Sequence, residues 1–267
     1  MMPATAKSFA SLLFAATLVS ASGCDVGSGP GGGGGGDEPD ATPGSEVDAS
    51  PQGGGAAVGV AMVPQANSGC TGTGASIACN GELGATFMFD VTATSTGGFA
   101  GDVTLSAGTL PANWTATFAP ATVTLTDGGT ANSVLTVRVG SNGAVGAQTL
   151  AMTTSSSAPA ANWGASFTVA NIYTARVTDT CTLPNSPGGT AGDPIRLPAG
   201  AAFRMLNATG GGIIIHADGQ EGFPHQDTGA VMAVNDYYEV TPPLTGTVYE
   251  WYCHQPDMGQ RSYVRFD

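Results

Sequence analysis

The sequence lacks helical periodicity and is poor in charge, above all in positive charge. No window carries apolar residues at a sustained period of 3.6, which argues against amphipathic helices. Charged residues make up 10% of the 267 positions, with 7 basic against 20 acidic residues and a formal net charge of −13. This balance argues against nucleic acid and anionic membrane surfaces as partners. The 41 glycines, with abundant threonine, serine, valine and alanine, are typical of extracellular all-β proteins.

The N-terminus has the organisation of an export signal. Lys7 precedes an apolar stretch, residues 9–19, which is too short to span a bilayer as a permanent helix, and small residues at 20–23 come directly before Cys24. Residues 1–23 therefore read as a signal peptide. The small residues before Cys24 resemble the lipobox of bacterial lipoproteins, which implies acylation of Cys24 and a membrane anchor facing the periplasm or cell surface. An ordinary secretory signal with Cys24 as a spare thiol is the alternative.

Residues 24–55 form a low-complexity segment rich in glycine, proline and acidic residues. It includes six consecutive glycines at 31–36, and it carries six acidic residues and no basic one. Such a composition cannot bury enough apolar surface to offset the entropy of ordering. We expect a flexible tether.

Residues 56–172 predict a first β domain. Apolar residues alternate in seven short segments, separated by glycine-rich turn signals, which favours an antiparallel sandwich. Residues 99–120 resemble bacterial immunoglobulin-like modules, which implies the architecture of this domain but not its activity. We expect the domain to be a spacer or adhesion module. Cys70 and Cys79 are expected to form a disulfide in an oxidising compartment. The domain has no histidine and its acidic residues are scattered, so it offers no catalytic constellation. The segments lie around residues 87–93, 103–105, 114–118, 123–125, 134–139, 149–152 and 167–169.

Residues 173–267 predict a second, smaller β domain that contains all three histidines of the chain. Its size and short strands suit a Greek-key barrel or sandwich. Alternation along the strand that ends at Cys253 places Tyr249, Trp251 and Cys253 on one face, toward the interior. The expected strands cover residues 172–177, 195–197, 202–206, 213–217, 237–240, 247–253 and 263–266.

A set of copper-binding side chains gathers after that strand. Cys253, His254 and Met258 fall within six residues, and a thiolate, an imidazole and a weak thioether favour copper over harder metals. A trigonal type 1 copper site needs a second histidine, for which His216 is the leading candidate. His225, nine residues beyond His216, is the alternative to His254 as a nitrogen donor.

The same region resembles the cupredoxin family. Residues 197–207 and 214–216 are similar to the strand and turn that lead to the first copper histidine, and residues 248–259 are similar to the strand and ligand loop that carry the cysteine and methionine. The resemblance implies a blue-copper domain that performs one-electron transfer with a redox partner protein and is not an enzyme. The chain departs from the family at Pro256, where the second histidine is normally found. Its only loop histidine, His254, is adjacent to Cys253 and points to the opposite face of an extended strand.

A disulfide is the competing interpretation. Cys181 and Cys253 are the only cysteines of the second domain, and in an oxidising compartment two such residues often pair. A Cys181–Cys253 disulfide would remove the thiolate and leave a metal-free surface-binding or adhesion module on a cupredoxin scaffold. A copper enzyme is a further alternative, but this chain has too few histidines for a second metal centre.

Overall fold

A computed structural model describes residues 55–158, 163–178, 189–217, 231–242, 244–253 and 261–267. In these residues the protein is all-β, as the sequence predicts: it has sixteen strands and one three-residue 3-10 helix, η1 (Gly74–Ser76). None of the described residues belongs to a helix that is long and apolar enough to cross a membrane.

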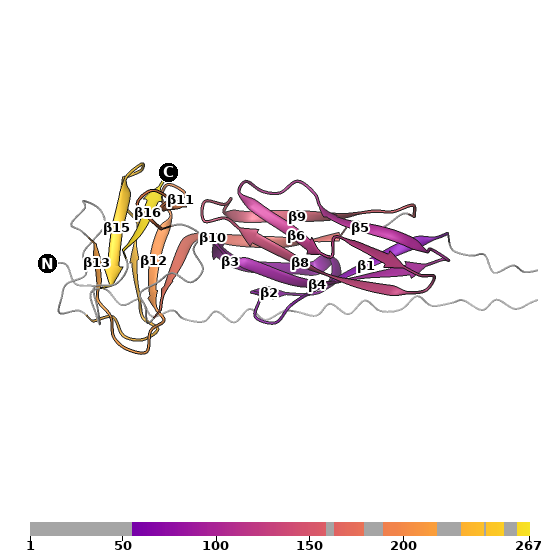
Figure 1. Ribbon diagram of the computed structural model, residues 1–267, viewed down its shortest axis with the longest axis horizontal. Coiled ribbons are helices and arrows are strands. Elements are labelled where there is room, and N and C mark those ends of the chain that lie inside the picture. Colours follow the sequence, from indigo (N-terminus) through magenta and orange to yellow (C-terminus); the bar gives the residue numbers. More distant parts are fainter. Residues whose placement is uncertain (1–54, 159–162, 179–188, 218–230, 243, 254–260) are drawn as a thin grey trace, which may run out of the picture. The chain divides into compact units, whose positions relative to one another are not determined.

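The first part of the described chain folds into an immunoglobulin-like sandwich of two sheets (Figure 1). One sheet has the order β1-β4-β8-β6, and the other places β3 beside β10, followed by β9, β5 and β7, with the short β2 on β3. The strands are β1 (Ala57–Pro64), β2 (Cys70–Thr71), β3 (Ile77–Leu83), β4 (Thr86–Thr96), β5 (Gly101–Ala107), β6 (Trp114–Ala119), β7 (Thr122–Leu125), β8 (Thr130–Val139), β9 (Gly146–Ser155) and β10 (Trp163–Val177).

Phe167 of β10 lies at the centre of the core between these sheets. Its ring contacts those of Phe87, Phe89 and Trp114 edge-on, with ring centroids 5.1, 6.4 and 5.3 Å away. All four side chains are buried, because alternate residues of each strand turn toward the opposite sheet. The predicted disulfide is confirmed: Cys70 and Cys79 are bonded to each other and join β2 to β3.

Strand β10 belongs to both sandwiches. Residues 163–169 pair antiparallel with β9, residues 165–173 pair in parallel with β3, and residues 172–177 pair in parallel with β12 (Ala202–Asn207). The register with β3 shifts between Ala170 and Tyr173, and Tyr173 pairs with both Leu83 of β3 and Phe203 of β12. The boundary drawn from the sequence at residues 172 and 173 therefore falls inside one continuous strand.

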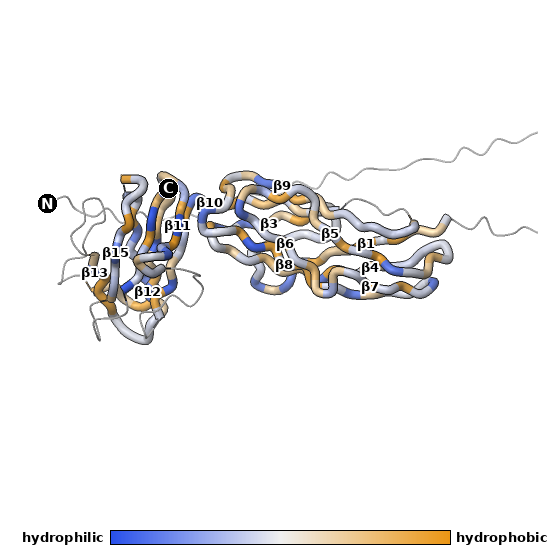
Figure 2. The backbone as a smooth tube through the Cα atoms, turned by 45° about the horizontal axis from the view of Figure 1, so that its top comes forward, coloured by the Kyte–Doolittle hydropathy of each residue, from blue (hydrophilic) through white to orange (hydrophobic). Residues whose placement is uncertain are grey.

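The last strands form a second, smaller sandwich. On one side, β12 and β14 (Tyr237–Val240) extend the eight-stranded sheet of the first sandwich through the end of β10. The other sheet has the order β11-β16-β15-β13 and contains β11 (Ile195–Leu197), β13 (Ile215–Ala217), β15 (Val248–Cys253) and β16 (Ser262–Phe266). Figure 2 shows apolar and polar residues alternating along the strands, and the apolar set fills the space between the two sheets.

Aromatic rings dominate this second core. The Phe203 ring stacks on Tyr173 at 6.1 Å and lies 5.9 Å from Trp251, so rings of β10, β12 and β15 are in contact. Tyr249 packs against Phe266 at 6.0 Å. Tyr249, Trp251 and Cys253 are all buried, which confirms the inward face predicted for β15.

An ion-pair cluster lies at the end of β16. The Asp267 carboxylate accepts a hydrogen bond of 2.9 Å from Arg196 and forms a second ion pair, 2.5 Å long, with Arg265. Desolvation raises the pKa of Asp267, but the hydrogen bonds and positive charges of the two arginines outweigh it, so the pKa falls below its ordinary value of 3.8. The carboxylate is about a third exposed, so water screens these charges.

Candidate functional site

The region predicted to bind copper centres on β13 and β15. These strands are antiparallel, and their register sets Ile215 opposite Cys253 and His216 opposite Tyr252. Residues directly opposite each other share a face of the sheet, while neighbours along a strand point to opposite faces. Cys253 and Ile215 therefore face the core, and His216 and Tyr252 point to the other face.

Cys253 is fully buried and disulfide-bonded. Only a deprotonated thiol binds a metal, and a sulfur in a disulfide carries no thiolate. The predicted role of Cys253 as a copper ligand therefore does not describe this structure. Its predicted disulfide partner, Cys181, lies outside the described residues.

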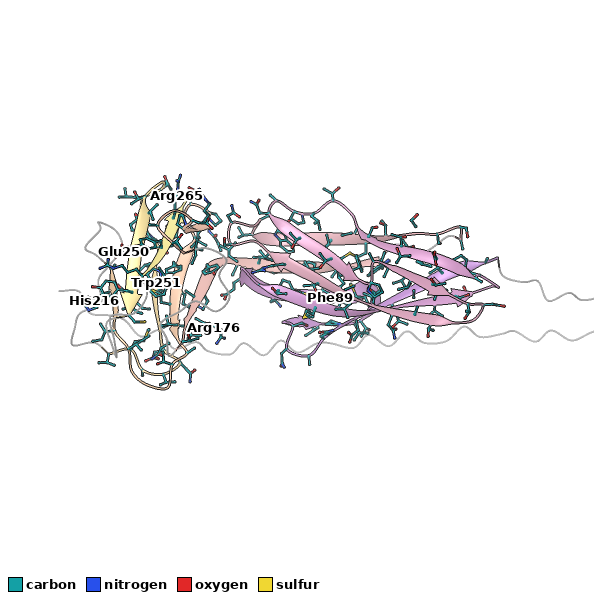
Figure 3. The ribbon with its side chains drawn as sticks, viewed as in Figure 1. Phe89, Arg176, His216, Glu250, Trp251 and Arg265 are labelled. Carbon is teal, nitrogen blue, oxygen red and sulfur yellow. A yellow bond between two sulfur atoms is a disulfide. The ribbon has the colours of Figure 1, made fainter. Side chains whose placement is uncertain are left out.

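His216 is 6% exposed and lies beside Tyr252, with ring centroids 5.6 Å apart and planes inclined by 30°. The strand register directs its imidazole away from the face that carries Cys253. Figure 3 labels His216 together with Trp251 and Glu250 of the neighbouring β15. The two predicted ligands that the structure describes are thus on adjacent strands but do not converge on one point.

The other predicted ligands, His225, His254 and Met258, lie outside the described residues, as does the lipidation site Cys24. Within the described ranges, no group of three or more histidine, cysteine, aspartate or glutamate side chains could hold a metal ion. The described donors do not fit a copper ion while Cys253 is in a disulfide.

The face that His216 shares also carries charged side chains. The guanidinium of Arg261 lies over the Tyr252 ring, 5.2 Å from its centroid, and Arg261 forms an ion pair with Glu250. A cation over an aromatic face is attracted by the ring quadrupole. This arrangement can hold Tyr252 in place next to His216.

A buried asparagine organises the segment that leads to β13. Asn207, 0% exposed at the end of β12, donates from Nδ2 to the carbonyl oxygens of Gly211 and Met232 at 2.8 and 2.9 Å. Its Oδ1 accepts hydrogen bonds from the backbone N–H and the hydroxyl of Thr209 at 2.9 and 2.7 Å. One side chain thus fixes residues 207–211 and the bridge between Ile213 and Met232. The sequence places Asn207 at a strand end but gives no sign of this network, since its partners come from two different segments.

Comparisons with known proteins leave the chain without a family. No family model matches it, and no curated protein matches it. Among solved structures it is similar to a protein of unknown function from Porphyromonas gingivalis W83, at 10% identity over 68% of this chain and 91% of that chain, with a TM-score of 0.23. It is also similar to the periplasmic chaperone SfaE, at 12% identity over 78% of this chain and 98% of that chain, with a TM-score of 0.26. Its similarity to the E. coli chaperone DraB is at 12% identity over 70% of this chain and 98% of that chain, with a TM-score of 0.22. Similarities this low carry no argument, so the assignment to β-sandwiches rests on the strand pairing.

Proposed function

We propose that the chain is an exported, lipid-anchored protein that acts by binding through its β-sandwiches, and not by catalysis or electron transfer. In this proposal Cys24 carries the lipid, the acidic segment is a tether, and Cys253 stabilises the second sandwich through a disulfide. The protein is then a metal-free binding or adhesion module on a cupredoxin-like scaffold.

The state of Cys253 carries this proposal. A disulfide sulfur that is fully buried between two sheets stabilises the fold by restricting the unfolded chain, and it is unavailable to a metal. The face of His216 gives independent support, because its imidazole lies beside Tyr252 and not beside Cys253. Both observations favour a structural role for the most cysteine- and histidine-rich part of the chain.

One-electron transfer at a copper ion is the second candidate. The observation that favours it is proximity along the sheet: His216 is one residue from Ile215, which pairs directly with Cys253. This function requires that the disulfide be reduced and that the imidazole be redirected toward the sulfur. A redox partner protein would then be needed as well.

Copper addition under oxidising and reducing conditions separates the two candidates. The mature chain, purified without reductant, is mixed with Cu(II), and the bound metal and visible spectrum are recorded before and after disulfide reduction. If Cys253 is in a disulfide, we expect no thiolate-to-copper absorption band in the unreduced protein. An intense band in unreduced protein that is lost in Cys253→Ala would refute the disulfide role and establish the copper site. His216→Ala would then show whether this imidazole is a ligand.

The lipid anchor has its own test. Cells that express the chain are labelled with radioactive palmitate, and the membrane fraction is compared for the wild type and Cys24→Ala. We expect the label and the membrane association in the wild type and neither in the variant. Equal membrane association without label would instead indicate an anchor other than a lipid at Cys24.

A further inference from the structure

A polar pocket of about 1060 Å³ lies where the β3–β4 hairpin approaches the second half of β10. Its lining comes from the loop at residues 67–69, the hairpin at residues 80–87, Arg138 of β8, and Tyr173, Thr174 and Arg176 of β10. Figure 3 labels Arg176 on this strand. The pocket involves none of the residues predicted to bind copper.

Covalent and hydrogen bonds fix the rim of this pocket. Gly69 and Asn80 line it, they are the immediate neighbours of the disulfide-bonded Cys70 and Cys79, and the Asn80 N–H donates to the Gly69 carbonyl oxygen at 2.9 Å. A rim held in this way loses little conformational entropy when a ligand binds.

The hairpin wall is equally constrained. The Val139 N–H donates to the Ala85 carbonyl oxygen at 2.9 Å, which ties the hairpin to β8 next to Arg138. A Cβ atom at Gly84 would lie 2.9 Å from the Tyr173 ring, so the glycine lets this ring pack against the turn. The pocket is therefore built from positions that have little freedom to move.

Two arginines give the pocket its charge. Of the six arginines in the described residues, four form ion pairs with carboxylates elsewhere in the second sandwich. Arg138 and Arg176 are in none of the ion pairs of the described residues, are exposed, and line this one pocket. Glu82 is the single acidic residue of the lining, and its carboxylate accepts a hydrogen bond of 2.9 Å from Thr174. Two positive charges thus face one negative charge in a chain whose formal net charge is −13.

We propose that this pocket binds an acidic oligosaccharide through Arg138 and Arg176. A guanidinium is a planar fork of donors that matches a carboxylate or phosphate group. The remaining polar lining, including Asn67, Ser68 and Asn80, supplies donors and acceptors for sugar hydroxyls. The volume of about 1060 Å³ lies just above the range of about 300–1,000 Å³ that small-molecule sites occupy, which leaves room for more than one sugar ring. This inference names a ligand class for the binding function proposed above and rests on that proposal.

The test is isothermal titration calorimetry of the mature, unreduced chain in low-salt buffer with four probes. Digalacturonate carries carboxylates, glucose 6-phosphate carries a phosphate, maltose is neutral, and inorganic phosphate has no sugar. We expect saturable binding of digalacturonate or glucose 6-phosphate with a Kd of about 1 mM or tighter, at least about tenfold tighter than maltose. The tighter of the two acidic probes identifies the anionic group as carboxylate or phosphate.

Matched charge variants assign the binding to this pocket. Arg138→Gln and Arg176→Gln should each weaken binding by about tenfold, since each removes a charge-assisted hydrogen-bond donor. Arg196→Gln removes the same charge outside the pocket and should leave the affinity within about twofold, because Arg196 does not line the pocket and its charge is paired with Asp267. Urea unfolding of each variant verifies that it is folded.

Several outcomes overturn the inference. They are equal affinity for maltose, equal loss in Arg196→Gln, inorganic phosphate binding as tightly as the acidic sugars, and no saturable binding of any probe up to about 10 mM. If none of the four probes binds and Cys253 still resists alkylation, the inference about the pocket is refuted and the proposed function stands. A free Cys253 thiol that binds copper refutes the proposed function and leaves the pocket to be judged by its own titrations.

Discussion

Replacing Asn207 by alanine should destabilise the second sandwich severely. The side chain is fully buried and makes four hydrogen bonds of 2.7–2.9 Å, two as donor and two as acceptor. Alanine removes all four and leaves the carbonyl oxygens of Gly211 and Met232, and the N–H and hydroxyl of Thr209, without this partner. At about 1 kcal/mol net for each hydrogen bond, the loss is about 4 kcal/mol, and more where a group stays unsatisfied.

Urea unfolding at neutral pH, followed by tryptophan fluorescence and far-ultraviolet circular dichroism, measures this loss. Trp251 reports on the second sandwich because it lies in its core. Asn132→Ala is the matched control: Asn132 is exposed and accepts one hydrogen bond, from Thr92 at 3.0 Å, so we expect a change below about 1 kcal/mol. If Asn207→Ala unfolds within about 0.5 kcal/mol of the wild type, the network does not stabilise the fold and the reasoning is refuted.

Asn207→Asp separates hydrogen bonding from shape. The new carboxyl keeps the acceptor for Thr209 but presents an oxygen to the carbonyl oxygens of Gly211 and Met232, so burial and repulsion raise its pKa in the folded state. A group with a raised pKa contributes stability below its unfolded pKa, about 3.9, and loses it as the pH rises through the folded pKa. Asn207→Asp should therefore approach wild-type stability in acid and fall away from it toward neutral pH. A pH profile parallel to that of Asn207→Ala would contradict this assignment.

Three further predictions follow from packing and charge. Phe167→Ala should destabilise the first sandwich by about 3–5 kcal/mol in urea unfolding, since it empties the centre of the aromatic cluster, and a loss below about 1 kcal/mol would place the core elsewhere. Gly84→Ala and Gly128→Ala both put a side chain at positive φ, but only the Cβ at position 84 meets a tyrosine ring. The melting temperature of Gly84→Ala should therefore fall further than that of Gly128→Ala. An equal fall in both variants would mean that the tyrosine ring moves aside freely. Asp267→Asn should remove a small, pH-dependent contribution to the free energy of unfolding. The lowered pKa stabilises the wild type above pH 3.8 and the effect is lost as the pH falls through the folded pKa, so identical acid-unfolding curves would count against the ion pairs.

Alternation made the strands of the fold predictable from sequence. In β4, Phe87, Phe89 and Val91 alternate with exposed residues, so both the strand and its buried face could be predicted. The same holds for Tyr249, Trp251 and Cys253 in β15. Strands β1, β2 and β3 were missed, and in β3 the reason is that Asn80 and Gly81 in its middle are typical of a turn.

Properties that depend on pairing between distant segments could not be predicted in this way. The continuity of β10 follows from its partners β3 and β12, which pair with overlapping stretches of the strand, whereas the local sequence signals only two separate apolar runs. The pocket arginines were missed for the same reason, since Arg138 and Arg176 are exposed residues of strands far apart in the sequence.

The candidate copper site illustrates this limit. The sequence correctly directs Cys253 inward, but the face of His216 depends on the register between β13 and β15, which no short-range pattern sets. A shift of one residue in this register would bring the imidazole to the face of the sulfur. The kinds of side chain that could bind copper could therefore be identified from the sequence. Whether Cys253 and His216 point to a common position could not.

The state of Cys253 in the mature protein distinguishes most directly between a structural disulfide and a copper ligand. The protein is purified without reductant, unfolded in guanidinium, treated with an alkylating reagent, digested and analysed by mass spectrometry, with a reduced sample as the control. We expect the peptide containing Cys253 to be unlabelled and linked to a second cysteine peptide before reduction, and fully labelled afterwards. A Cys253 that is alkylated without reduction would contradict the account, because a free thiol at this position restores the ligand that copper requires.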